Sequence, residues 1–169
     1  MQRGYTYSSI MVYNIIMYIN KKFFNTIKPI LNRLEDKIGN DFIVFGSAPL
    51  YLIGIVDFNK NINDLDVAIK EKNKIPKEAN EVTFQGDPNQ KLYKLKINNI
   101  EVDIGTCWPG QENYFYKLFN NPIVVDGFKF ANLDVCEEWK ERMVKKYNRE
   151  KDKKYLIKIK KYRAKQKDE

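Results

Sequence analysis

The 169-residue sequence contains no histidine and only two cysteines, Cys107 and Cys136. The lack of histidine excludes Ser-His and Cys-His nucleophilic catalysis, and it excludes zinc sites with histidine ligands. Two cysteines cannot build a disulfide framework or a cysteine-rich zinc site, and they favour a reducing, cytoplasmic location. A metal ion held by this chain therefore needs oxygen ligands, which favours a hard cation such as Mg²⁺ or Mn²⁺.

The sequence also lacks a hydrophobic run long enough to cross a bilayer. Its N-terminal apolar stretch, residues 10–19 (IMVYNIIMYI), contains Asn14 and is short, whereas a spanning helix needs about 20 apolar residues. No small-residue cleavage site follows this stretch, so it is not typical of a signal peptide. We expect a buried first helix that begins at Ser8 or Ser9, and no membrane partner.

With 43% hydrophobic and 31% charged residues, the composition is that of a globular protein with one compact domain. Residues 1–40 are predicted to form N-terminal helices that pack on a core spanning residues 41–131. Residues 132–169 are predicted to form basic C-terminal helices.

The positive charge of the chain is concentrated near its C-terminus. The net charge is +8, yet residues 140–169 alone hold 14 Lys and Arg against 5 Asp and Glu, and the remainder of the chain has a net charge of −1. A helical stripe of Tyr155, Leu156, Ile159 and Tyr162 should turn inward and leave most lysines of the last helix outward. Such a surface either keeps the protein soluble or binds a polyanion.

Periodicity and turn residues give the order of the elements. The expected elements are a helix over 26–40 with Pro29 in its first turn, a strand over 41–45, a helix over 48–55, a polar loop over 56–63, a strand over 64–69, a surface excursion over 71–90, a hairpin turning at Asn98 and Asn99, a helix that starts at Asp134, and a last helix over 149–165.

Three aspartates follow the alternation of two predicted strands. In DLDVAI (64–69), Asp64 and Asp66 lie on the face opposite Leu65, Val67 and Ile69, with their Cβ atoms about 6–7 Å apart. Without a counter-charge the two carboxylates repel each other, and a divalent cation removes that conflict. Asp103, on a second strand, could complete the site. Carboxylates so arranged can hold one or two Mg²⁺ ions at the phosphates of a nucleotide.

A Gly-Ser pair precedes the aspartates at a predicted strand-to-helix turn. Gly46 allows the backbone to approach a phosphate closely, and the start of the next helix supplies unpaired N–H groups. Ser47 can donate a hydrogen bond from its hydroxyl. The sequence therefore predicts a cradle for an anion next to a metal site.

The order Gly-Ser, helix, DLDVAI and VDIG resembles the nucleotidyltransferases of the DNA polymerase β type in their minimal form, over residues 42–152. Relatives by pattern include kanamycin and lincosamide nucleotidyltransferases, tRNA-terminal transferases and antitoxin-like proteins. The resemblance implies that Asp64, Asp66 and Asp103 bind the catalytic metals and that Gly46 and Ser47 hold the triphosphate. It also places Arg149 and Lys151, within REKD (149–152), near the nucleotide phosphates. The gap between Ser47 and Asp64 is longer than is usual in that family.

The resemblance implies an α+β fold, a mixed sheet backed by helices with two C-terminal helices. It implies transfer of a nucleoside monophosphate from a nucleoside triphosphate to a hydroxyl on RNA, DNA, a protein or a small molecule. The basic C-terminal end slightly favours a nucleic acid. Two alternatives have a different character: a basic nucleic-acid-binding module, and an inactive member that works through protein contacts. Trp108, just after Asp103, is either a core residue or a platform for a base.

Overall fold

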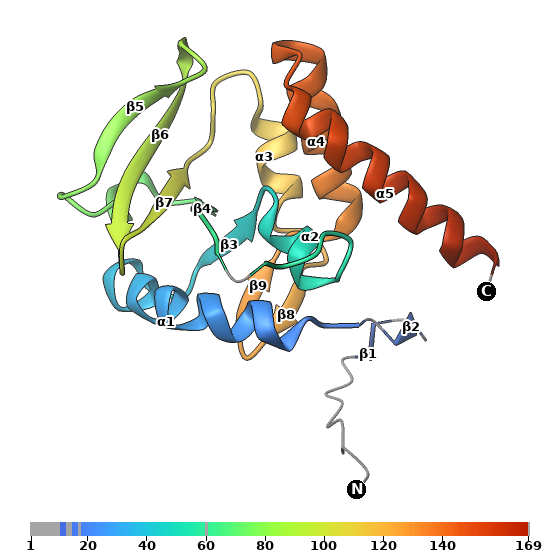
Figure 1. Ribbon diagram of the computed structural model, residues 1–169. Coiled ribbons are helices and arrows are strands. Elements are labelled where there is room, and N and C mark those ends of the chain that lie inside the picture. The colour runs from blue at the N-terminus through green and yellow to red at the C-terminus, as the bar shows by residue number, and fades with distance from the viewer. Residues whose placement is uncertain (1–10, 13–14, 17, 60, 169) are drawn as a thin grey trace, which may run out of the picture.

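The computed structural model describes residues 11–12, 15–16, 18–59 and 61–168. The elements along the chain are β1 (Met11–Val12), β2 (Ile15–Ile16), α1 (Lys21–Ile38), β3 (Phe42–Phe45), α2 (Ala48–Leu52), β4 (Asp64–Ile69), the 3₁₀ turn η1 (Lys72–Lys74), β5 (Asn80–Phe84), β6 (Asp87–Ile97), β7 (Ile100–Gly105), α3 (Glu112–Lys117), β8 (Ile123–Val125), β9 (Phe128–Phe130), α4 (Leu133–Tyr147) and α5 (Glu150–Asp168). Figure 1 shows α1 below the sheet and α4 and α5 across from the β5–β6 hairpin.

One mixed sheet of seven strands organises the molecule, in the order β5-β6-β7-β4-β3-β9-β8. β4 runs parallel to β7 and antiparallel to β3, while β3 runs parallel to β9. Helices cover both faces of this sheet. The predicted α+β class, a mixed sheet backed by helices with two helices at the C-terminal end, is confirmed.

The two faces of the sheet pack against different helices because side chains alternate along each strand. On β3, Phe42 and Val44 join the core formed with α1, whereas Ile43 and Phe45 join the core formed with α3, α4 and α5. On β4, Leu65, Val67 and Ile69 face the α1 side. The other face of β4, which carries the aspartates, therefore lies on the side of the C-terminal helices.

The first helix differs from its prediction at its start. α1 begins at Lys21, after Asn20, whose side chain accepts a hydrogen bond from the backbone N–H of Phe23 at 3.1 Å. Pro29 consequently lies inside the helix and not in its first turn. The helix expected from Ser8 or Ser9 falls largely outside the described residues. Its described pieces, β1 and β2, are short antiparallel strands, which suits their β-branched and apolar residues.

The excursion predicted over residues 71–90 contains ordered strands. β5 and the first half of β6 form a long antiparallel hairpin with a bulge between Thr83 and Phe84. The prediction missed β5 because its alternation is short, with partly buried Val82 and Phe84 between exposed polar residues, and because Gly86 and Pro88 follow closely and are typical of loops. The hairpin turn between β6 and β7 is as predicted, because Asn98 and Asn99 both adopt positive φ, at 49° and 65°.

The two C-terminal helices form as predicted, apart from the residue that starts the first. Asn132 caps α4, since its side chain accepts a hydrogen bond from the backbone N–H of Val135 at 3.1 Å. Asp134 and Glu137 instead bind Arg163 on α5. In α5, Tyr155 and Ile159 are buried and Leu156 and Tyr162 are partly buried. Across the described residues, no helix combines the length and apolar character needed to cross a membrane.

Candidate active site

The register of β4 and β7 brings the three aspartates to one place. The strands are parallel, with Asp66 directly paired with Asp103, and Asp64 lies two residues before Asp66 on the same face. Asp103 is buried, and Asp64 and Asp66 are partly buried. Three carboxylates on adjacent strands therefore share one face beneath the C-terminal helices.

Gly46 makes room for one of these carboxylates. The residue lies in the turn between β3 and α2 with a φ of +71°, a conformation that glycine adopts without strain. A Cβ atom at this position would lie 2.1 Å from Oδ2 of Asp66. The sequence predicted a glycine for close approach of a phosphate, and the structure adds that any side chain here would displace Asp66.

Ser47 follows at the start of α2, where its side chain makes no capping hydrogen bond to the helix. The hydroxyl lines two adjacent cavities and is therefore placed to bind a ligand. α2 has only five residues, from Ala48 to Leu52, so its helix dipole is much weaker than the sequence led us to expect. A cradle at this turn would depend on the Gly46 backbone and the Ser47 side chain.

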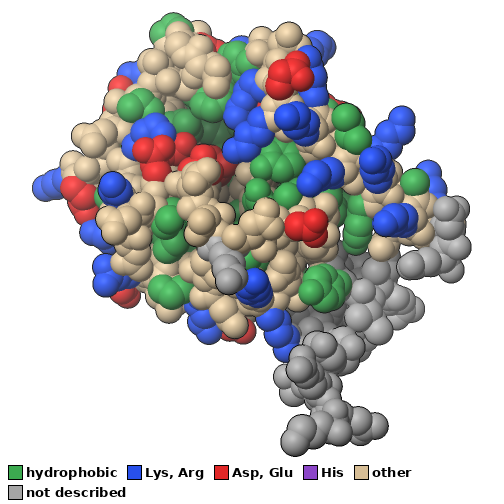
Figure 2. All heavy atoms as spheres, in the orientation of Figure 1, with side chains coloured by type: hydrophobic (Ala, Val, Ile, Leu, Met, Phe, Trp, Pro, Cys, Tyr) green, Lys and Arg blue, Asp and Glu red, His purple; other side chains and the backbone are tan. Residues whose placement is uncertain are grey.

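A small cavity of about 70 Å³ collects the predicted residues. The sheet contributes Asp64, Asp66 and Asp103 to its lining, and the turn contributes Ser47. Lys140 of α4, Lys151 of α5 and Arg149 in the link between these helices complete it. A second cavity of about 140 Å³ shares Ser47, Asp64 and Lys151 with the first. Figure 2 shows acidic side chains gathered in a hollow of this face, with basic side chains beside them. Carboxylates thus face cations across the cavity.

Lys140 also lines the cavity, although the sequence did not predict it as a site residue. Its side chain is only 5% exposed, and its Nζ lies 3.0 Å from Oδ1 of Asp152. Asp152 is fully buried, and its Oδ2 lies 3.2 Å from Nε of Arg149. A signal was present in the sequence: Lys140 falls on the same helical stripe as the buried Cys136 and Met143. A lysine on the apolar stripe of a helix needs a buried partner, here Asp152.

The contacts of Asp152 are close but not directional. Within the described part of the chain, neither carboxylate oxygen has a partner with hydrogen-bond geometry, although both lie within ion-pair distance of a cation. The positive charges of Lys140 and Arg149 therefore stabilise the buried carboxylate of Asp152 between α4 and α5. The same contacts fix the positions of Lys140 and Arg149 at the cavity.

Burial among neighbouring carboxylates raises the pKa of Asp66 to about 7. Burial is the main cause and the negative charge of Asp64 the next, while Lys140 opposes them. The pKa of Asp103 is also raised, mainly by burial, and the ion pair with Lys94 works against that shift. Nζ of Lys94 lies 3.1 Å from Oδ1 of Asp103 and also contacts Glu101.

These donors suit a hard divalent cation, because carboxylate oxygens are its preferred ligands and a cation would relieve the repulsion that raises the pKa of Asp66. As the side chains lie, no group of three or more Asp, Glu or Cys residues in the described ranges is arranged to hold a metal ion. Asp103 is instead paired with Lys94, whose Nζ lies 3.1 Å from its Oδ1.

Trp108 is a core residue. It is 2% exposed, and its indole N–H donates a hydrogen bond to the carbonyl oxygen of Lys91 at 3.0 Å. Its ring stacks on Trp139 with centroids 5.6 Å apart. A Cβ atom at Gly105 would lie 2.6 Å from the Trp108 ring, so glycine is needed there for packing. The ring forms part of the cavity wall and is not a free platform for a base.

Comparisons with known proteins agree with this architecture at the level of the fold. No protein-family model matches the sequence, and no curated protein matches it significantly. Among solved structures, the chain is similar to a "putative nucleotidyltransferase" from Thermotoga maritima, with a TM-score of 0.50 and 13% identity over 83% of this chain and 96% of that chain. The chain has a nucleotidyltransferase-like fold.

A Helicobacter pylori structure described in the same words has a TM-score of 0.39 and 15% identity, over 72% of this chain and 59% of that chain. A TM-score at that level carries no argument. The similarity to the Thermotoga protein concerns the course of the backbone, so the function of this chain depends on its own side chains.

Proposed function

We propose that the chain is a metal-dependent nucleotidyltransferase, which transfers a nucleoside monophosphate from a nucleoside triphosphate to a hydroxyl acceptor and releases pyrophosphate. The observation that carries this proposal is one cavity lined by Asp64, Asp66 and Asp103 on the sheet and by Lys140, Arg149 and Lys151 from α4, α5 and the link between them. A polyanionic substrate bound through a divalent cation needs both sets of charges.

The three aspartates would hold Mg²⁺ or Mn²⁺, which when bound neutralises phosphate charge and aligns the reacting oxygens. Ser47 would donate its hydroxyl to a phosphate oxygen. Lys140, Arg149 and Lys151 would pair with the negative charge that builds up on the leaving pyrophosphate. The cations come from α4, α5 and the link between them, and the contacts of Lys140 and Arg149 with Asp152 set those two side chains before substrate binds.

In this reaction the acceptor oxygen forms a bond to the α-phosphorus while the bond from that phosphorus to the bridging oxygen breaks. Pyrophosphate leaves with the electron pair of that bond, and the hydroxyl proton passes to the carboxylate cluster. The chain's own groups therefore bind the phosphates, orient them against the acceptor, and receive one proton.

For the acceptor we propose a nucleic acid. Lys151 lines the site, and exposed lysines at spacings of three and four residues continue from it along one face of α5; these are Lys154, Lys158, Lys161 and Lys165. A row of cations that begins at the reacting centre suits a polymer of phosphates, because each phosphate can meet one lysine.

The test uses the four nucleoside triphosphates, each labelled at the α-phosphate, with Mg²⁺ or Mn²⁺ and a cell extract. We expect one nucleotide to give a labelled acceptor, with release of pyrophosphate. Asp66→Asn should lose transfer while circular dichroism shows an intact fold. Absence of label transfer with every nucleotide and both metals would contradict the proposal, as would undiminished transfer by Asp66→Asn.

A further inference from the structure

Gln90 is a buried polar residue to which the proposed reaction gives no role. It lies on β6, is 1% exposed, and lines the same cavity as the three aspartates. Burial of an amide costs free energy unless its oxygen and nitrogen find partners. The orientation of this amide therefore shows what the cavity presents to a ligand.

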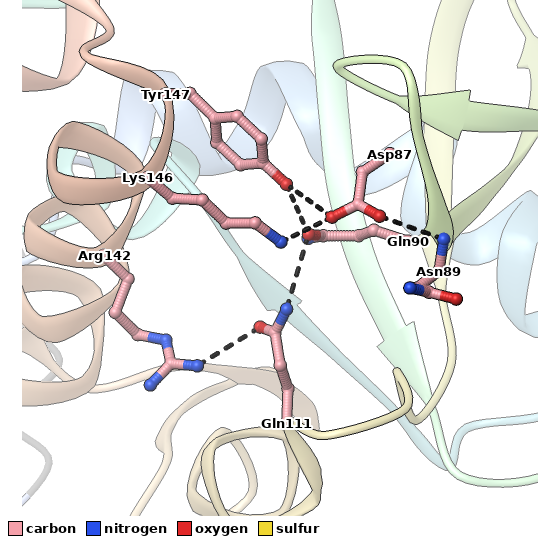
Figure 3. A network of polar contacts seen from close by, with 7 residues as sticks. All are labelled: Asp87, Asn89, Gln90, Gln111, Arg142, Lys146 and Tyr147. Carbon is pink, nitrogen blue, oxygen red and sulfur yellow. Dashed lines mark hydrogen bonds and ion pairs between the residues drawn. The ribbon is translucent and has the colours of Figure 1, made fainter.

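A chain of hydrogen bonds fixes that orientation (Figure 3). Nη2 of Arg142 donates to Oε1 of Gln111 at 3.3 Å, and a guanidinium can only donate, so the oxygen of the Gln111 amide must face Arg142. Nε2 of Gln111 then faces Gln90 and donates to its Oε1 at 3.4 Å. The oxygen of Gln90 is thereby directed toward Gln111.

Tyr147 strengthens this arrangement. Its hydroxyl lies 2.9 Å from Oε1 of Gln90 and 3.3 Å from Oδ2 of Asp87. Lys146 pairs with the same carboxylate of Asp87, and the backbone N–H of Asn89 donates to its other oxygen. The network joins the β5–β6 hairpin to α3 and α4, so the position of Gln90 is set from three elements.

The amide nitrogen of Gln90, Nε2, has no hydrogen-bond partner among the described residues, where both bonds of Gln90 go to its oxygen. Nε2 is also not fully enclosed, because the enclosed unpaired side-chain atoms of the described residues are the two oxygens of Asp152. Gln90 lines the cavity, and Nε2 is the polar atom of its side chain that remains available to a ligand there.

The surroundings of Nε2 identify the ligand group. The cavity also receives Lys140, Arg149 and Lys151, all of which carry positive charge and can only donate hydrogen bonds. The three aspartates of the cavity would be neutralised by a metal ion, so two further N–H donors beside three cations suit an anionic oxygen of the ligand. We propose that Gln90 is a substrate-binding residue whose Nε2 donates to a phosphate oxygen of the nucleoside triphosphate, with Gln111, Arg142 and Tyr147 as positioning residues. This inference rests on the proposed function.

The test measures the binding of inorganic pyrophosphate and of each nucleoside triphosphate by calorimetry at pH 8, with Mg²⁺ present. Gln90→Glu keeps an oxygen for Gln111 and Tyr147 but replaces the free donor by an anion, and we expect about ten- to a hundredfold weaker binding. Gln90→Leu removes the donor without adding charge, and we expect a smaller loss. Asn89→Asp, an exposed neighbour with the same change of charge, is the control.

Affinity reduced in both Gln90 variants, with the control and the melting temperatures near wild type, supports the assignment. Unchanged pyrophosphate affinity in both variants would overturn it, as would an equal loss in Asn89→Asp. Failure of the wild-type protein to bind pyrophosphate or any nucleotide would be a different result, because it would overturn the proposed function together with this inference.

Discussion

Asp66 lies between a glycine that leaves it room and two carboxylates that repel it. Gly46 cannot carry a side chain without displacing Asp66, and Asp64 and Asp103 flank it on β4 and β7. This environment raises the pKa of Asp66. At the scale of single residues, such conflict between charges is typical of functional positions, because stability alone would favour an uncharged side chain.

The raised pKa of Asp66 predicts how stability depends on pH when no divalent cation is present. Its pKa is about 7 in the folded protein and about 4 in an unfolded chain, so between these values the folded state holds a proton that the unfolded state has lost. The free energy of unfolding therefore falls as the pH rises from about 4 to 7. Asp66→Asn should flatten this dependence and raise the melting temperature at pH 8.

The measurement is a series of thermal melts from pH 5 to 8 in the presence of EDTA. Asp57→Asn, which changes an exposed carboxylate, serves as the control and should follow wild type. Part of the slope should persist in Asp66→Asn because the pKa of Asp103 is also raised. Identical slopes for wild type and Asp66→Asn would show that Asp66 does not titrate in this range.

At the scale of elements, one buried ion pair joins α4 to α5. Asp152→Ala would leave Lys140 buried and without its partner, which costs about 3–5 kcal/mol in other proteins, and we expect a loss of about 3 kcal/mol of unfolding free energy. The double variant Lys140→Met with Asp152→Leu should regain at least half of that loss, because neither charge remains buried alone. Urea denaturation measures both variants.

Glu150→Ala provides the comparison for this experiment, since Glu150 lies on the same turn of α5 in an exposed ion pair with Lys153. Its loss should cost less than about 0.5 kcal/mol. If Asp152→Ala were as mild as Glu150→Ala, the pair would not connect the helices as described.

Local patterns in the sequence predicted the elements whose cause is local. Alternation placed Asp64 and Asp66 on one face of β4, and two asparagines marked the turn between β6 and β7. β5 was missed because only Val82 and Phe84 mark its buried side, and its place in the sheet comes from pairing with β6. Lys140 and Gln90 were missed for a related reason, as their roles depend on residues distant in the sequence.

At the scale of the whole molecule, the basic face of α5 predicts salt-dependent binding of nucleic acid. The triple variant Lys158→Gln, Lys161→Gln and Lys165→Gln should weaken binding of RNA and single-stranded DNA. It should also lower the slope of log K against log salt by about 2, because each lost phosphate contact accounts for about 0.7. Fluorescence titrations at several salt concentrations measure the affinity and the slope.

The matched control removes three exposed lysines from elsewhere on the chain, Lys22→Gln, Lys77→Gln and Lys96→Gln. Equal effects of the two triple variants would show that net charge alone drives binding. No binding by the wild type at low salt would remove nucleic acid as the acceptor and favour a protein or a small molecule.

The position of β3 inside the sheet has a consequence for how the protein is made. β3 pairs with β4 on one side and with β9 on the other, where Val44 meets Phe130, and the backbone N–H of Ala131 bonds to the Val44 carbonyl. The lining of the cavity also includes Lys151, which lies on the last helix. A ribosome must therefore release the chain through Lys151 before the site can assemble, and a growing chain that stops before β9 exposes the unpaired edge of β3 to any other strand nearby.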